Sequence, residues 1–142
     1  MSFIGVANKF LNDNKVDKQT YVSLANQRLA TKEIGNEEAL YALYSDCNEL
    51  LYIGWAKHIT QRLGAHFKSY TNTQDFKGNI AYAKYTFRLN ELRSKFDAII
   101  KKHDPELEVW DLEYFTIGVL KPKHNKVICG EMRIKIADEK AH

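Results

Sequence analysis

Two short runs of aromatic and branched residues, LYALYS and LLYIG, constrain the fold more than any other feature of this sequence. The four residues between them, Asp46 to Glu49, have a composition that favours a turn. Strand-forming residues on both sides of such a turn predict a β-hairpin. The chain therefore contains an antiparallel sheet, and its helices have to be arranged around that sheet.

A helix is predicted directly after the hairpin. Ile59, Leu63 and Phe67 recur at four-residue intervals and form one apolar stripe that a helix can bury against the hairpin. Arg62 and His66 are also four residues apart and share the neighbouring face of this helix. The pattern therefore sets a guanidinium and an imidazole side by side next to the sheet.

Hydrophobic periodicity predicts further elements before and after this unit. Near the N-terminus, helical spacing predicts two short helices, and Gly35 is placed to end the second. Downstream, an alternating run predicts a third strand, two helical runs follow it, and the tail alternates like a late edge strand. In chain order, the predicted elements outside the hairpin unit are helices at residues 3–10 and 21–29, a strand at 79–87, helices at 89–102 and 109–120, and a strand at 132–136.

The composition describes one globular domain and excludes collagenous, disulfide-stapled and membrane-spanning chains. With 142 residues, 44% of them hydrophobic, the chain can bury an apolar core without a structural metal or a disulfide. No stretch approaches the roughly 18 apolar residues of a membrane span, and the N-terminus lacks the features of a secretion signal. The two cysteines, Cys47 and Cys129, are far apart in sequence and predict free thiols in a cytoplasmic protein. The net charge of +3 is compatible with a polyanionic partner but does not require one.

Glu113 is the charged residue that most needs an explanation. Its predicted helix, LEYFTIGVLK, is apolar nearly all round, which is typical of a buried helix. A buried carboxylate must be paired, hydrogen-bonded or bound to a cation, because an unpaired buried charge is costly. An ion pair with arginine or lysine and a metal site explain this residue about equally well.

The tyrosines of the hairpin and the arginine after it have a spacing that resembles the GIY-YIG nuclease family. The second half of the family signature is intact as Tyr52, Ile53 and Gly54. Tyr41 lies 11 residues before Tyr52, where the family has its first tyrosine, and Arg62 lies 10 residues after Tyr52, where the family has an arginine. Several matching types at these offsets make coincidence improbable.

The resemblance continues to residue 125 and covers about residues 39–125. His66 falls where many members also carry histidine, and Glu113 stands nine residues before Pro122. The segment from Pro122 to Asn125, PKHN, resembles the turn that closes the family domain. The chain also departs from the family pattern, because Ala39 and Leu40 replace the usual glycine and isoleucine.

For the fold, the resemblance implies an α+β domain with a small three-stranded antiparallel sheet flanked by helices. We expect an N-terminal helical extension at residues 1–38, a GIY-YIG nuclease-like domain at 39–126, and a C-terminal tail at 127–142 with a possible edge strand. The 46 residues between His66 and Glu113 exceed those of minimal members, so the helix near residues 89–103 is the expected insertion.

For the chemistry, the resemblance implies a metal-dependent DNA endonuclease that hydrolyses phosphodiester bonds. In this interpretation Glu113 holds one Mg²⁺ or Mn²⁺ ion, and Arg62 stabilises the charge of the transition state. Tyr41 is the expected general base or water-orienting group, with neighbours that lower its phenolic pKa. His66 accepts the proton of Tyr41, and Tyr52 hydrogen-bonds the phosphate.

Four further positions are predicted to contact or support the nucleic acid: Lys57, Gly54, Asn125 and Lys68. Lys57 partly compensates for Trp55, which stands where many relatives have a basic residue. Cleavage of both DNA strands requires two active sites or two visits, so a homodimer is one expectation.

Two other interpretations stay open at this point. A nucleic-acid-binding module that has lost turnover fits the departures at Ala39 and Trp55. An unrelated α+β interaction domain would make Tyr41, Tyr52 and Glu113 structural residues. The sequence identifies neither a recognition sequence nor a preferred DNA structure.

Overall fold

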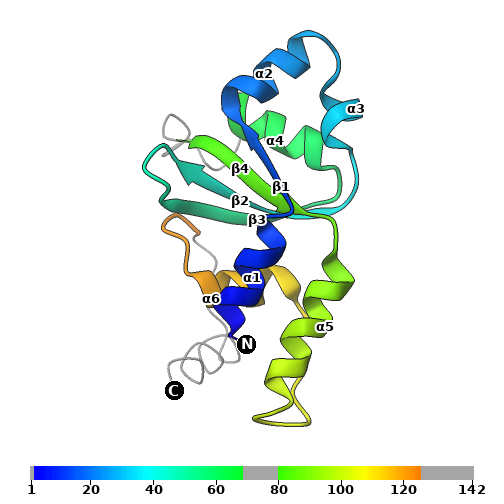
Figure 1. The fold of residues 1–142 in the computed structure, drawn as a ribbon, viewed down its shortest axis with the longest axis vertical. Coiled ribbons are helices and arrows are strands. Elements are labelled where there is room, and N and C mark those ends of the chain that lie inside the picture. The colour runs from blue at the N-terminus through cyan, green and yellow to red at the C-terminus, as the bar shows by residue number, and fades with distance from the viewer. Residues whose placement is uncertain (1, 69–79, 126–142) are drawn as a thin grey trace.

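The computed structural model describes residues 2–68 and 80–125, and the described residues form an α+β fold (Figure 1). The predicted hairpin, the helix after it and the next strand are all confirmed. In chain order the elements are α1 (Phe3–Leu11), β1 (Asn14–Asp17), α2 (Lys18–Asn26), α3 (Ala30–Ile34), β2 (Ala39–Ser45), β3 (Leu50–Ala56), α4 (Ile59–Lys68), β4 (Ile80–Thr86), α5 (Leu89–Ile100) and α6 (Leu112–Leu120).

The strands form one antiparallel sheet in the order β1-β4-β2-β3. Strand β2 lies in the interior of the sheet, and all seven of its residues are buried. Its register sets Tyr41 opposite Gly54 of β3 on one side and Tyr85 of β4 on the other. Strand β3 lies at the edge of the sheet, so the backbone groups on its outer side need partners from elsewhere.

The sheet has four strands in the described residues, so the prediction of three strands was wrong. The missed strand, β1, lies inside the region expected to be helical and pairs with β4. It has only four residues, NKVD, and Val16 is the single buried one. Such a run has too little apolar alternation to predict a strand, and its pairing with β4 is what forms it.

The N-terminal region also holds three helices where two were predicted. The chain leaves the helical conformation at Arg28, whose φ angle is 59°, and this separates α2 from α3. Gly35 then ends α3 rather than α2, with a φ angle of 94° that favours glycine. The chain turns there toward β2.

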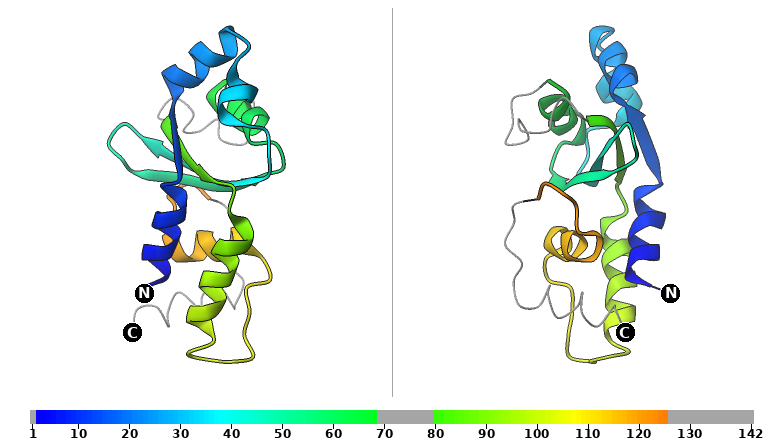
Figure 2. Two further views of the ribbon diagram at one scale, coloured as in Figure 1. Left: turned by 45° about the vertical axis from the view of Figure 1, so that its right-hand side comes forward. Right: turned by 90° about the vertical axis from the view of Figure 1, so that its left-hand side faces the viewer.

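Helices cover both faces of the sheet and form two hydrophobic cores (Figures 1 and 2). Alternation along β2 sends Leu40, Ala42 and Tyr44 into the core with α1, α5 and α6. The same alternation sends Ala39, Tyr41 and Leu43 into the core with α2, α3 and α4. The predicted active-site tyrosine thus faces the helix that carries Arg62 and His66.

Helix α6 begins at Leu112, three residues later than predicted. Asp111 caps it, because the Asp111 side chain accepts a hydrogen bond from the backbone N–H of Tyr114 at 3.0 Å. The preceding segment is held to α5, where Asp97 accepts from the N–H of Val109 and Arg93 donates to the Val109 carbonyl. The predicted strand at residues 132–136 lies outside the described residues. None of the described helices is long and apolar enough to cross a membrane.

A polar cluster joins the start of β1 to the end of β4. The Asp13 carboxylate accepts hydrogen bonds from Arg88 at 2.8 and 2.9 Å and from the buried hydroxyl of Thr86 at 2.6 Å. The hydrogen bond from Arg88 is the main cause that lowers the pKa of Asp13 below its usual value. The ionised carboxylate therefore stabilises the folded chain above the unfolded pKa, and this stabilisation is lost as the pH falls through the folded pKa.

We expect Asp13→Asn to lower the free energy of unfolding at pH 7 by about 1 kcal/mol, since Arg88 is partly exposed and solvent screens the pair. Urea unfolding at pH 7 and at pH 3 measures the difference between the variant and the wild type. That difference should shrink at pH 3, which lies below the usual carboxyl pKa, because the unfolded wild-type chain then gains stability by binding the proton at Asp13. A difference that is the same at both pH values would contradict this role for Asp13.

Candidate active site

The sequence-predicted site residues gather where α4 and α6 meet strands β2 and β3. The apolar stripe of helix α4 fixes the orientation of the helix, because Ile59, Leu63 and Phe67 are all buried in the core between α4 and the sheet. This packing turns His66 toward β2 and leaves Arg62 exposed on the next face. The expected juxtaposition of the two side chains is present.

A buried hydrogen bond joins Tyr41 to His66. The Tyr41 hydroxyl lies 2.7 Å from Nε2 of His66, and the two residues are only 1% and 2% exposed. The ring of His66 also contacts Tyr52, with a centroid separation of 5.4 Å. Three side chains of the predicted catalytic set therefore touch one another.

His66 is held in its neutral form at neutral pH. Burial, and then the positive charge of Arg62, lower the pKa of His66 to about 4. A neutral imidazole has one nitrogen that accepts a hydrogen bond. When that nitrogen is Nε2, the Tyr41 hydroxyl donates to it, and Nε2 is the atom in contact with the phenolic proton.

The expectation that neighbours lower the pKa of Tyr41 is wrong for the protein alone. Burial raises this pKa well above its ordinary value, the neighbouring Tyr52 and Glu113 raise it further, and only Arg62 lowers it. The physical reason is that the phenolate would be a charge in an apolar core. Tyr41 is therefore a neutral phenol at neutral pH, and its proton can leave only if another group receives it.

Tyr52 and Gly54 lie on the face of β3 that is turned toward Tyr41 and His66. Tyr52 is half-buried, and burial and the charge of Glu113 raise its pKa. Gly54 lies directly opposite Tyr41, and a Cβ atom at this position would collide with the phenol ring and hydroxyl of Tyr41. The signature glycine is thus explained by close approach of a side chain rather than by backbone conformation.

Glu113 reaches the outer edge of β3 from the first turn of α6. Its Oε2 atom accepts a hydrogen bond from the backbone N–H of Trp55 at 3.0 Å. Burial and the carboxylate of Asp111 raise the pKa of Glu113, while the Trp55 N–H and Arg62 lower it. Among residues 2–68 and 80–125, no lysine or arginine forms an ion pair with Glu113. The ion-pair explanation therefore has no support in this part of the chain.

Arg62 links these side chains through its charge. The guanidinium shifts the pKa values of Tyr41, Tyr52, His66 and Glu113, each in the direction expected of a nearby positive charge. The structure thus brings all five predicted catalytic side chains into one electrostatic neighbourhood. Because Arg62 is exposed, its guanidinium is open to a ligand from solvent.

The segment from Pro122 to Asn125 pairs with the outer edge of β3. The Asn125 side chain accepts from the N–H of Ile53 and donates to its carbonyl, both at 2.8 Å. The N–H groups of Lys123 and His124 donate to the carbonyls of Leu50 and Leu51. Asn125 therefore positions β3, and its predicted contact with nucleic acid stays a prediction.

The other predicted nucleic-acid contacts are only partly described. Lys57 is exposed just after β3, on the chain that leads into α4. Gly54 is buried against Tyr41, so its contribution is the space that it leaves for the Tyr41 phenol. The side chain of Lys68 lies outside the described residues.

Asp111 is a residue of the site that was not predicted from the sequence. This carboxylate lies two residues before Glu113, caps α6 and raises the pKa of Glu113 by its charge. The signal was present, because aspartate directly before an apolar helical run is a typical N-cap. The same cap sets the start of the helix at Leu112.

The oxygen donors at the start of α6 fit a hard divalent cation. Two carboxylates, Asp111 and Glu113, act on each other unfavourably, and the hydrogen bond from Trp55 uses only one of the two Glu113 oxygens. Oxygen donors with water in the remaining positions suit Mg²⁺ or Mn²⁺. The described residues contain no group of three or more His, Cys, Asp or Glu side chains that would hold a metal by themselves. A cation here would depend on Glu113, with water or substrate as its other ligands.

One of three comparisons with known proteins found a match. A family model described as the GIY-YIG catalytic domain matches residues 38–126 of the 142-residue chain. The comparison with curated proteins and the comparison with solved structures found no match. The family match spans both tyrosines, Arg62, His66 and Glu113.

Gly54→Ala is expected to lower the free energy of unfolding by roughly 1–3 kcal/mol, because the added methyl overpacks the core against Tyr41. Chemical denaturation of the variant measures this loss. In a Tyr41→Leu background the loss should be smaller, since the distal ring carbons and the hydroxyl that would meet the methyl are all gone. Equal losses in both backgrounds would show that Tyr41 is not the residue that requires glycine.

The imidazole of His66 should titrate near pH 4 in an NMR experiment on the protein without metal. Arg62→Ala should raise this pKa, because it removes a positive charge that disfavours the imidazolium. The value should stay below 6.5 in the variant, since burial is the larger cause and is unchanged. An identical pKa in both proteins would contradict the proximity of Arg62 to His66.

Proposed function

The chain belongs to the GIY-YIG family, and from this premise we propose that it is a metal-dependent endonuclease that hydrolyses phosphodiester bonds of DNA. The catalytic domain of this family is a nuclease domain, so membership implies nuclease activity in general. The observation that carries the finer proposal is the buried hydrogen bond between Tyr41 and a neutral His66. It supplies a path for the proton that the attacking water must lose.

In the proposed first step, the proton of Tyr41 moves to Nε2 of His66 while Tyr41 takes a proton from water. The phenol thus returns to its neutral form, so a charged phenolate does not have to persist in the core. The resulting hydroxide attacks phosphorus. Arg62 normally disfavours the imidazolium, and a phosphate bound at its guanidinium offsets that charge. Substrate binding therefore makes His66 a better proton acceptor.

Arg62 and Tyr52 are proposed to bind the phosphate itself. Arg62 is exposed and carries a planar guanidinium that donates two parallel hydrogen bonds to non-bridging oxygens. These bonds strengthen as negative charge develops on the five-coordinate phosphorus. The Tyr52 hydroxyl, next to His66, is proposed to donate one more hydrogen bond.

Glu113 is proposed to hold the divalent cation that nucleases of this family typically use, with Mg²⁺ or Mn²⁺ as the ion. When bound, the cation supplies positive charge that stabilises the leaving 3′ oxygen. The hydrogen bond from Trp55 and the cap at Asp111 keep the Glu113 carboxylate oriented. Cleavage of both strands by this single site would use a homodimer or two separate visits.

We favour the enzyme over a binding module without turnover because none of the unusual residues removes a group that we assign to the chemistry. Ala39 and Leu40 are completely buried in β2, where they pack into the two cores. Trp55 follows Gly54, so its side chain leaves β3 on the opposite face from Tyr52, while its N–H still binds Glu113. We also propose a cytoplasmic protein, since Cys47 is a free, exposed thiol.

The experiment that tests this function is cleavage of supercoiled plasmid. With Mg²⁺ or Mn²⁺ the wild type should nick or linearise the plasmid, and chelator should leave it intact. Arg62→Ala and Glu113→Gln should each lower the rate by about 100-fold or more, because each removes charge stabilisation of the transition state.

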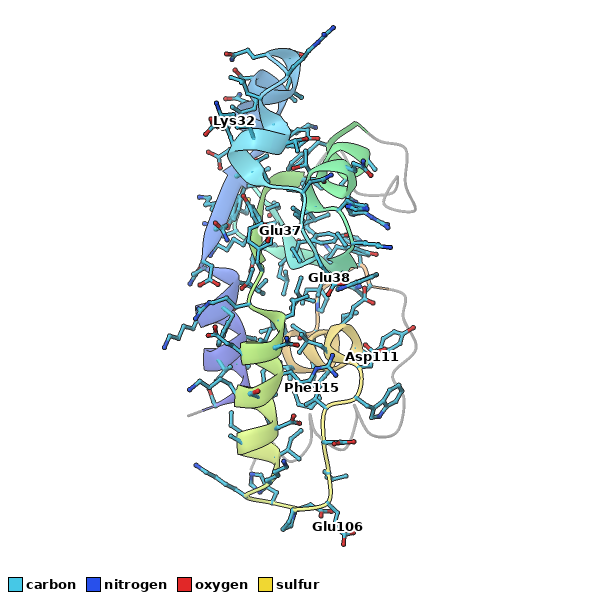
Figure 3. The ribbon with its side chains drawn as sticks, turned by 90° about the vertical axis from the view of Figure 1, so that its right-hand side faces the viewer. Lys32, Glu37, Glu38, Glu106, Asp111 and Phe115 are labelled. Carbon is cyan, nitrogen blue, oxygen red and sulfur yellow. The ribbon has the colours of Figure 1, made fainter. Side chains whose placement is uncertain are left out.

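Two distant variants serve as matched controls for the plasmid assay. Lys101→Ala removes an exposed positive charge just after α5, and Glu106→Gln neutralises an exposed carboxylate in the loop between α5 and α6 (Figure 3). Both should cleave like the wild type. DNA binding without cleavage in any metal would support the binding module instead, and full activity of Glu113→Gln would reject the metal role.

A further inference from the structure

Both tryptophans of the chain line one hollow beside Glu113. Trp55 is 42% exposed and Trp110 is 66% exposed, although such large aromatic side chains are usually well buried. The hollow encloses about 370 Å³, and its polar lining residues are Glu38, Asn90, Arg93, Asp111 and Glu113. Figure 3 shows Glu38 and Asp111 on the same side of the molecule, next to the segments that lead into β2 and α6.

The backbones that carry the two indoles are held in place. The N–H of Trp55 donates to Glu113, and the segment before Trp110 is pinned to α5 through both backbone groups of Val109. Directly after Trp110, Asp111 caps α6. The two rings are therefore presented on fixed supports, at a set position relative to the carboxylate that we assign to the cation.

The chemistry of the lining selects the face and edge of a base rather than a phosphate. Exposed aromatic rings stack on nucleobases, whichever base is present. Three carboxylates outnumber the one guanidinium, Arg93, which already donates to the Val109 carbonyl, so the lining disfavours phosphate. The carboxylates accept hydrogen bonds from the amino groups of bases, and the Asn90 amide both donates and accepts. In a duplex the faces of the bases are covered by their neighbours, so only an unpaired base can enter.

Resting on the proposed function, we propose that this hollow binds one unpaired nucleobase of the DNA substrate next to the scissile phosphate. The protein then prefers DNA that carries an unpaired nucleotide beside the cut over a perfect duplex. A volume of about 370 Å³ lies at the lower end of the roughly 300–1,000 Å³ of small-molecule sites, which suits a single base better than a protein segment.

Tryptophan fluorescence in chelator tests this binding without any cleavage. Because both tryptophans lie in the hollow, all tryptophan emission reports on it. A single-stranded 12-mer should quench this emission, and the same sequence as a duplex should quench it far less. Trp110→Ala should weaken the affinity for the single strand by at least about fivefold, the lower limit for loss of one base stack. Val22→Ala, a matched change at a distant residue that is 40% exposed, should not.

Cleavage in Mg²⁺ separates this inference from the proposed function. The wild type should cut a duplex with a one-nucleotide bulge faster than the perfect duplex, and Trp110→Ala should lose this preference while it still cuts the perfect duplex. Trp110→Phe should restore part of the preference, because phenylalanine also stacks.

Two results would overturn the inference alone: plasmid cleavage by the wild type with no preference for the bulge, or equal quenching by single strand and duplex. No response of the tryptophans to any oligonucleotide would also overturn it. Absence of cleavage on every DNA, with single-strand quenching intact, would reject the nuclease function instead and leave the base site standing.

Discussion

The outer edge of strand β3 is the constraint on which the rest of the site depends. An edge strand presents backbone N–H and carbonyl groups that need partners. Here the partners are not another described strand but side chains and a turn: Glu113 meets the N–H of Trp55, Asn125 meets both groups of Ile53, and His124 meets the carbonyl of Leu51. The hydrogen bond between Glu113 and the N–H of Trp55 satisfies the edge of the sheet and also holds the Glu113 carboxylate near Tyr41 and Tyr52.

Desolvation decides the charge state of the residues gathered there. Burial raises the pKa of Tyr41, lowers that of His66 and raises that of Glu113, so it disfavours the charged form of each. Arg62 opposes this for Tyr41 and Glu113 and reinforces it for His66, because its charge favours anions and disfavours cations. The protein therefore holds a neutral phenol and a neutral imidazole in contact, an arrangement suited to passing a proton rather than to storing a charge.

Much of the site was predictable because local patterns carry it. The turn between the two aromatic runs fixes the hairpin, and the stripe of Ile59, Leu63 and Phe67 fixes which face of α4 is buried. Arg62 and His66 then follow from helical geometry alone. The raised pKa of Tyr41 was not predictable, since it depends on how completely the side chain is enclosed by residues distant in the chain. Strand β1 was missed for a related reason, because Asn14–Asp17 becomes a strand only through its pairing with β4.

The sequence by itself determined the hairpin, the face of the helix that follows it and the identity of the family, because these depend on residue types at short, fixed spacings. Only the tertiary structure decided where Glu113 lies, which groups satisfy β3, and that Trp55 and Trp110 share one hollow. These contacts join segments more than fifty residues apart. The relative positions of the segments are set by the packing of α6 against the sheet. No periodicity within either segment records such a contact, since it depends on the path of the chain between the two segments.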